Sequence, residues 1–163
     1  MDDKDSKPDD NDTCNAVYES IYDAVLAFNE AGDFFPLWGT CMGFQVISIV
    51  ASRNASVLEL NGFDSEDLSL RLDLTRAARD APLLTSLSPG ARTDLATKNI
   101  TSNLHHDGVT PTAFAASNLS AAFQVLSTNK DRKGKAFVST IAHRTLPITA
   151  TQWQVHFKAQ REF

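Results

Sequence analysis

The residue with the clearest potential for chemistry is Cys41, which lies in the stretch FFPLWGTCMGF at residues 34–44. A G-x-C-x-G pattern between a strand and a helix is typical of a nucleophile elbow, a tight turn that exposes its central side chain. A helix that begins directly after the cysteine would favour the thiolate, because the positive end of its dipole faces the sulfur. The backbone amide of Met42 would then face a developing oxyanion. A buried cysteine with a purely structural role fits the same residues, so the pattern alone leaves both interpretations open.

A cysteine nucleophile needs a base, and the chain offers four histidines. His105 and His106 lie in a polar stretch rich in turn residues, which predicts exposed loop positions. His143 is expected at a strand end, and His156 lies in a predicted strand near the carboxyl terminus. The spacing of these residues does not select the base. It also shows no ligand-like pairing with cysteine or carboxylate, so we expect no metal site.

The helix and strand that would position Cys41 are predicted by hydrophobic spacing. A helix is expected to begin after Asp12 or Thr13, with an apolar face built on every third or fourth residue, and to end at Gly32. This face comprises Val17, Ile21, Val25 and Phe28, widened by Tyr18, Tyr22 and Leu26. The segment FFPLW then predicts a short strand, and residues 42–51 predict a buried helix. This order of elements indicates an α/β fold.

The rest of the chain predicts mainly short strands. The expected strands cover residues 57–62, 69–75 and 148–157, and a β-hairpin is expected from FQVLSTN and KAFVSTIA around the turn residues KDRKG. Residues 78–90 are expected to form a short helix or a loop.

Composition limits the classes of partner. The net charge of −5 and the isoelectric point near 5.2 argue against a nucleic-acid partner. No apolar run is long enough to span a bilayer, so we expect no membrane partner. We expect residues 1–12 to be a disordered acidic tail and residues 13–163 to form the folded domain.

Several blocks of sequence, in the same order, resemble the gamma-glutamyl hydrolases. FFPLWGTCMGF resembles the nucleophile segment of that family, and NLHHDGVTPTAF resembles a second family block. FQVLSTN, followed by KAFVSTIAHRTLPITATQW, resembles the strands that lead to the catalytic histidine of the family. The resemblance runs from about Cys14 to the end of the chain.

The resemblance implies a fold and an activity. The implied fold is an α/β three-layer sandwich with a mostly parallel central sheet, of the class I glutamine amidotransferase-like type, here lacking the amino-terminal strands. The implied reaction is cysteine-type hydrolysis of γ-glutamyl bonds in folylpoly-γ-glutamates through a thioacyl enzyme, with no metal or cofactor. A vacuolar, lysosomal or extracellular location and a homodimer are also implied.

The resemblance assigns roles to individual residues. Cys41 takes the place of the nucleophile, Met42 that of the oxyanion amide, and His105 that of a histidine that holds the substrate. Where the family reads Q-W-H-P-E, this chain reads QWQVH, so Gln154 stands at the base position and His156 at the glutamate position. His156 is therefore a weak candidate for a displaced base.

The substitution at the base position predicts impaired hydrolysis, because the amide of Gln154 cannot accept a proton at neutral pH. The alternative is a non-catalytic relative that binds γ-glutamyl or folate ligands or pairs with another subunit. One further interpretation is a glutaminase-type amidotransferase domain, which we rank last because the FPLWGTCMGF and NLHHDGVTP blocks resemble the hydrolases more closely.

Overall fold

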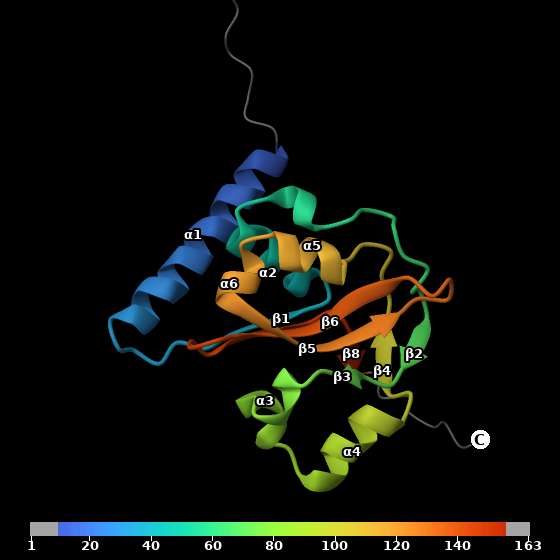
Figure 1. Ribbon diagram of the computed structural model, residues 1–163. Coiled ribbons are helices and arrows are strands. Elements are labelled where there is room, and N and C mark those ends of the chain that lie inside the picture. Colours follow the sequence, from blue (N-terminus) through green and yellow to red (C-terminus); the bar gives the residue numbers. More distant parts are fainter. Residues whose placement is uncertain (1–9, 156–163) are drawn as a thin grey trace, which may run out of the picture.

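The computed structural model describes residues 10–155, and their side chains from residue 16 to residue 154. A central sheet carries helices on both faces, which confirms the predicted three-layer α/β class (Figure 1). The larger hydrophobic core lies between the sheet and the α1, α2, α5 and α6 side, and it includes Phe44, Phe123 and Ile141. A smaller core, which includes Leu84 and Leu126, lies under α3 and α4. Across residues 10–155, no helix is both long enough and apolar enough to cross a membrane.

The helices of the structure are α1 (Asp10–Glu30), α2 (Met42–Ser52), α3 (Pro82–Thr85), α4 (Pro89–Thr97), α5 (Pro111–Ala116) and α6 (Leu119–Ala122). Two 3₁₀ turns cover Ala55–Val57 and Ala77–Arg79. The strands are β1 (Leu37–Thr40), β2 (Leu68–Leu70), β3 (Asp73–Leu74), β4 (Thr101–Asn103), β5 (Phe123–Lys130), β6 (Ala136–His143), β7 (Ile148–Thr151) and β8 (Gln154–Val155).

These strands form two sheets, of which the larger has the order β1-β7-β6-β5-β3 and the smaller the order β2-β4-β8. Only β1 and β7 pair in parallel, and every other pairing between the described strands is antiparallel. The expectation of a mostly parallel sheet is thus corrected for the described strands. The reason is local, because the β5–β6 hairpin and the short connection from β6 to β7 impose antiparallel pairing.

Helix α1 confirms the predicted helix but differs from it at its start and on its packed face. It begins at Asp10, so the last residues of the predicted tail are helical. It ends as predicted, and Gly32 has a φ of +93°. Tyr22 and Val25 are buried, whereas Val17 and Ile21 are 53% and 51% exposed. Only part of the predicted apolar face is therefore covered.

The predicted strands differ most where tertiary contacts break them. Residues 57–62 form no strand and contribute one isolated bridge between Glu59 and Gly108. The predicted strand over residues 148–157 bends after β7, where the N–H of Gln152 donates to Ser139 O at 2.8 Å. The chain then joins the smaller sheet as β8. His156, the weak candidate for a displaced base, lies outside the described residues.

Candidate active site

Cys41 forms the turn between β1 and α2. Its φ and ψ of 54° and −108° lie in a region that residues with a side chain rarely adopt. Its N–H donates to Thr151 O of β7 at 2.8 Å, and its carbonyl accepts from the N–H groups of Phe44 and Gln45 at 3.0 and 3.2 Å. The neighbouring strand and the first turn of α2 therefore hold this residue from both sides, as an elbow requires.

The two glycines around Cys41 have different roles. A Cβ atom on Gly39 would lie 2.6 Å from both Gly43 O and Ile47 Cδ1. Nothing lies within 4 Å of a Cβ atom on Gly43. Gly39 is thus required for the close approach of β1 to α2, whereas Gly43 is not required by sterics.

The start of α2 provides a favourable setting for negative charge. Met42 is the first residue of this helix, and its N–H has no partner within the helix itself. The first turn carries no acidic residue whose negative charge would repel a thiolate at the positive end of the helix. Cys41 is partly exposed and Met42 is 67% exposed, so a ligand can approach this turn.

His105 is buried, and hydrogen bonds tie its loop to the elbow helix. Its Nδ1 lies 2.9 Å from Asp107 O, and the same carbonyl accepts a hydrogen bond from Gln45 Nε2 at 3.2 Å. Gln45 lies one turn after Cys41 on α2. The prediction of an exposed loop position is wrong for His105, because its ring packs edge-on against Phe137 at 4.9 Å between centroids and is 4% exposed.

The hydrogen bond of His105 fixes which ring nitrogen carries the proton. A carbonyl only accepts, so Nδ1 must be the protonated nitrogen. Burial lowers the pKa of His105, and the bond to the Asp107 carbonyl opposes this shift only in part. The ring is therefore neutral near pH 7 and presents an unprotonated Nε2.

Buried polar atoms without partners occur on segments around β4 and β8. Within the described side chains there are five, and they belong to Ser65, Asn103, His105 and Gln152. Asn103 lies in β4, His105 two residues later, and Ser65 shortly before β2, the neighbour of β4. Gln152 precedes β8, on the other side of β4, and directly follows Thr151, whose carbonyl binds Cys41. Such atoms are costly unless a bound water or a ligand satisfies them.

The other two histidines among the described residues, His106 and His143, have partners of their own. His106 Nε2 is 3.7 Å from Glu66 Oε2 on an exposed surface. His143 ends β6 and accepts a hydrogen bond from the N–H of Leu146 at 3.0 Å. Its neighbour Ala142 pairs with Thr149, which places His143 at the opposite end of β7 from Cys41, roughly 13 Å along the strands. Across the side chains of residues 16–154, no histidine hydrogen-bonds to Cys41.

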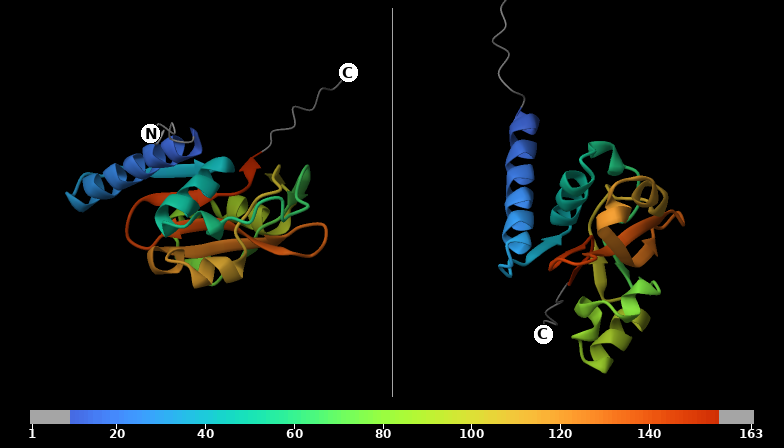
Figure 2. Two further views of the ribbon diagram at one scale, coloured as in Figure 1. Left: turned by 90° about the horizontal axis from the view of Figure 1, so that it is seen from above. Right: turned by 60° about the vertical axis from the view of Figure 1, so that its left-hand side comes forward.

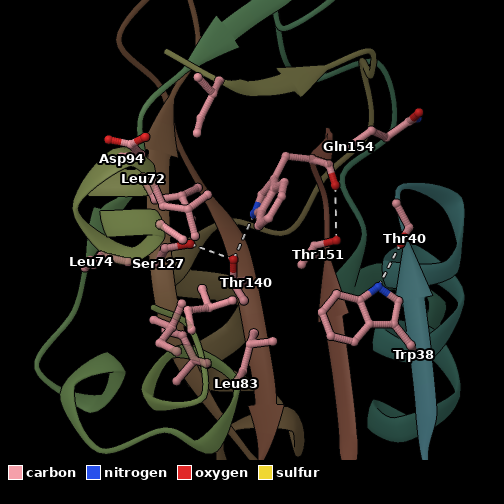
Figure 3. A pocket seen from close by; sticks show the side chains of 17 residues that line it. Trp38, Thr40, Leu72, Leu74, Leu83, Asp94, Ser127, Thr140, Thr151 and Gln154 are labelled. Atoms are coloured by element: carbon pink, nitrogen blue, oxygen red, sulfur yellow. Dashed lines mark hydrogen bonds between the residues drawn. The ribbon is translucent and has the colours of Figure 1, made fainter. Parts of the chain in front are cut away.

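Gln154, the residue at the base position, lies on the wall of a cavity of about 470 Å³ (Figure 3). This cavity separates the sheet from the α3 and α4 layer, and Trp38, Thr40 and Thr151 line its side nearest to the elbow. Leucines form much of the remaining wall, including Leu72, Leu74, Leu83, Leu84, Leu87 and Leu95.

Polar groups inside the cavity satisfy one another. Ser127 Oγ donates to Thr140 Oγ1 at 2.7 Å, and Trp153 Nε1 donates to the same oxygen at 2.9 Å. The cavity is therefore apolar in character. Cys41 is not among the residues that line it, so the cavity does not join Gln154 to the sulfur.

Several of these features could not be found in the sequence. The roles of Gln45, Gln152 and Asn103 depend on burial and on pairing between distant segments. Gln152 belongs to the QWQVH stretch, but the resemblance assigns roles there only to Gln154 and His156. A glutamine or asparagine in isolation gives no signal of burial.

The class defined by the fold and the site is an α/β sandwich with a cysteine elbow at the end of a sheet strand. The chain is 36% identical over 134 residues to Gamma-glutamyl hydrolase B of Dictyostelium discoideum. It is 34% identical over 139 residues to Gamma-glutamyl hydrolase 1 of Arabidopsis thaliana, and 32% identical over 138 residues to Gamma-glutamyl hydrolase of Rattus norvegicus. The chain is thus homologous to gamma-glutamyl hydrolases over 82–84% of its length.

The chain spans about two fifths of the length of these curated relatives, with 38%, 39% and 42% of each covered. No family model matches it. Among solved structures, a putative GMP synthase protein of Thermoplasma acidophilum aligns with 84% of this chain and 57% of its own, at a TM-score of 0.46 and 15% identity.

Proposed function

We propose that this chain acts on γ-glutamyl bonds of folylpoly-γ-glutamates, with Cys41 as the nucleophile, and that its turnover is slow. The observation that carries the proposal is the elbow, where Cys41 takes a conformation that costs energy and gives no advantage to a structural thiol. The similarity to gamma-glutamyl hydrolases across this segment supports the same role.

The reaction proceeds in two steps, acylation of Cys41 and hydrolysis of the thioester. The Cys41 sulfur attacks the γ-carbonyl carbon, the C–N bond breaks, and the thiol proton leaves on the departing amino group. Water then attacks the thioester, which releases the γ-carboxylate and restores the thiol. The amide of Met42, at the positive end of α2, stabilises the oxyanion in both steps.

We assign recognition of the substrate to His105, whose loop is tied to α2, and to Gln152, which follows Thr151. The unprotonated Nε2 of His105 accepts a hydrogen bond from an N–H group of the glutamyl chain. The side-chain amide of Gln152, which is fully buried and without a partner among the described residues, supplies both a donor and an acceptor. A γ-linked glutamate carries matching amide and carboxylate groups.

The slow turnover follows from Gln154, which cannot take the proton of Cys41. A positioned base contributes about 10²–10⁴-fold to a rate. A thiol retains some reactivity without one, because a small fraction is thiolate at pH 7. Residual hydrolysis is therefore expected, rather than full activity.

The test is a gain of function. Purified protein would be assayed for glutamate release from a pteroyl-polyglutamate, beside Cys41→Ala as the background. The double variant Gln154→His with His156→Glu restores the family pattern of base and orienting carboxylate, and we expect it to raise the rate at least about tenfold.

A matched control tests whether the position of the added histidine determines the gain in rate. Lys130→His adds a histidine at the exposed end of β5 and should leave the rate unchanged. The proposal would be wrong if the wild type released glutamate no faster than Cys41→Ala and the double variant showed no gain in rate.

Gln154 also favours a second candidate function, which is binding without turnover. In that case a pteroyl-polyglutamate would raise the melting temperature of the wild type while no glutamate is released. His105→Phe keeps a ring in the aromatic pocket but removes Nε2, so it should abolish this stabilisation. Stabilisation that survives in His105→Phe would place the ligand elsewhere.

A further inference from the structure

Lys135 is the last residue of the turn between β5 and β6, and its side chain reaches a loop that lies before β2. Figure 2 shows the turn of this hairpin beside that loop, which comprises residues 59–63. The ammonium group of Lys135 pairs with the carboxylate of Glu59 and donates to Gly62 O at 3.2 Å. It also lies 4.7 Å from the centroid of the Phe63 ring, within the range of a cation–π contact. One side chain therefore holds the loop at both of its ends.

The same loop is hydrogen-bonded to the segment that follows His105. Three of its N–H groups find acceptors in residues 106–108 at 2.7–2.9 Å. These pairs are Glu59 with Gly108 O, Asn61 with Asp107 Oδ1, and Phe63 with His106 O. The carbonyl of Asp107, which accepts the hydrogen bond from His105 Nδ1, thus belongs to a segment that the 59–63 loop holds in place.

The loop also contacts the ring of His105 through Phe63. The Phe63 ring is 3% exposed, and its centroid lies 6.4 Å from that of His105 and 5.8 Å from that of Phe137. A Cβ atom on Gly108 would lie 3.0 Å from Phe63 Cε2, which leaves the ring no room to shift in that direction. The orientation of His105 therefore depends on the position of Phe63.

Asp131 fixes the point at which Lys135 leaves the hairpin. Its carboxylate accepts hydrogen bonds from the N–H groups of Lys133 and Lys135 at 2.9 and 2.8 Å. It also accepts one from the N–H of Asp64, the residue after the loop, at 3.0 Å. Burial raises the pKa of Asp131, but the hydrogen bonds from these N–H groups lower it by more, so the carboxylate is ionised near pH 7. The turn and the loop thus share one anchor.

We propose that Lys135 is a positioning residue for His105. It holds the 59–63 loop so that the Asp107 carbonyl keeps the proton on Nδ1, the Phe63 ring keeps the imidazole in place, and Nε2 is presented to the substrate. The inference rests on the role proposed for His105 in binding the glutamyl chain. Because the described side-chain contacts of Lys135 are with this loop, its loss should weaken substrate binding more than it slows the steps at Cys41.

Nitrogen NMR of the histidine rings in the free full chain tests the positioning without any substrate. Lys135→Met keeps most of the aliphatic side chain and removes the ammonium group. The wild type should show neutral His105 with its proton on Nδ1. In Lys135→Met we expect a mixture of the two tautomers and a pKa raised toward the ordinary value of histidine, because water reaches the ring. Lys135→Arg restores the charge and a donor, and it should restore the wild-type spectrum.

Two further variants control the comparison. Lys133→Met makes the same substitution in the same turn, at a side chain that is 79% exposed, and should leave His105 unchanged. Glu59→Gln removes the charge that pairs with Lys135 but keeps the backbone bonds of the loop, so it should shift the tautomer and pKa of His105 in the same direction. It also keeps the proposal testable if Lys135→Met does not fold.

A pteroyl-polyglutamate provides the second measurement. Its half-saturating concentration, taken from turnover or from the rise in melting temperature, should increase at least about fivefold in Lys135→Met, while kcat changes less than about twofold. An unchanged His105 tautomer and pKa in both Lys135→Met and Glu59→Gln would overturn the positioning role, as would an equal change in Lys133→Met. A wild type that neither binds nor cleaves the ligand would instead refute the proposed function, and the NMR comparison would still decide whether Lys135 positions His105.

Discussion

At the scale of single residues, the backbone of Cys41 is the most informative feature. Its φ of 54° combined with a ψ of −108° is a low-energy conformation for glycine and a strained one for every other residue. The hydrogen bonds that hold it come from β7 and α2, so the strain is imposed by the neighbouring elements. An exposed nucleophile gains from such a turn, whereas a buried structural thiol does not.

We predict that Cys41→Gly is more stable than Cys41→Ala by about 1 kcal/mol. Both variants remove the sulfur, but only glycine removes the strain of about 1–3 kcal/mol, which the extra freedom of glycine in the unfolded chain offsets in part. The free energy of unfolding in urea measures the difference. An alanine variant that equals or exceeds the glycine variant would show that the turn is unstrained.

Sequence reasoning found Cys41 because glycines on both sides are a local signal of a turn. It placed His105 in an exposed loop because the neighbouring residues are polar. Burial of this ring depends on Phe63 and Phe137, which are distant in sequence, so no local pattern could reveal it. The partnerless amide of Gln152 was missed for the same reason.

At the scale of elements, strong helical periodicity and short turns were the dependable signals. Helices α1 and α2 and the β5–β6 hairpin form where the sequence predicts them. The predicted strand over residues 148–157 fails because contacts with β6 bend the chain at Gln152 and Trp153. The alternating pattern continues through this bend and therefore hides it.

The end of α1 offers a test at this scale. Gly32 has a φ of +93°, so Gly32→Ala should lower the free energy of unfolding by about 1–2 kcal/mol through backbone strain alone. No atom lies within 4 Å of the added methyl group at this position. Gly90 has equally open space but lies within α4, so Gly90→Ala should leave stability unchanged or raise it by about a few tenths of a kcal/mol. Equal effects at the two sites, measured by urea unfolding, would contradict this account.

At the scale of the whole molecule, the two helical layers differ in how firmly they pack on the sheet. Helix α2 buries Phe44, Ile47 and Val50 in the larger core. Helix α4 buries no residue, and the apolar cavity of about 470 Å³ lies between its layer and the sheet, beside the smaller core. Local opening requires little energy where few apolar side chains leave a core. The α4 layer should therefore open without unfolding of the rest.

Hydrogen exchange measures this difference directly. We predict that amides in the last turn of α4 exchange at least about tenfold faster than those in the last turn of α2, since these N–H groups have helical partners in both helices. The β5–β6 hairpin, which lies against both cores through Phe123 and Leu126, should be as protected as α2. Equal protection of α4 and α2 would mean that the two layers open as one unit and that the cavity does not weaken the molecule.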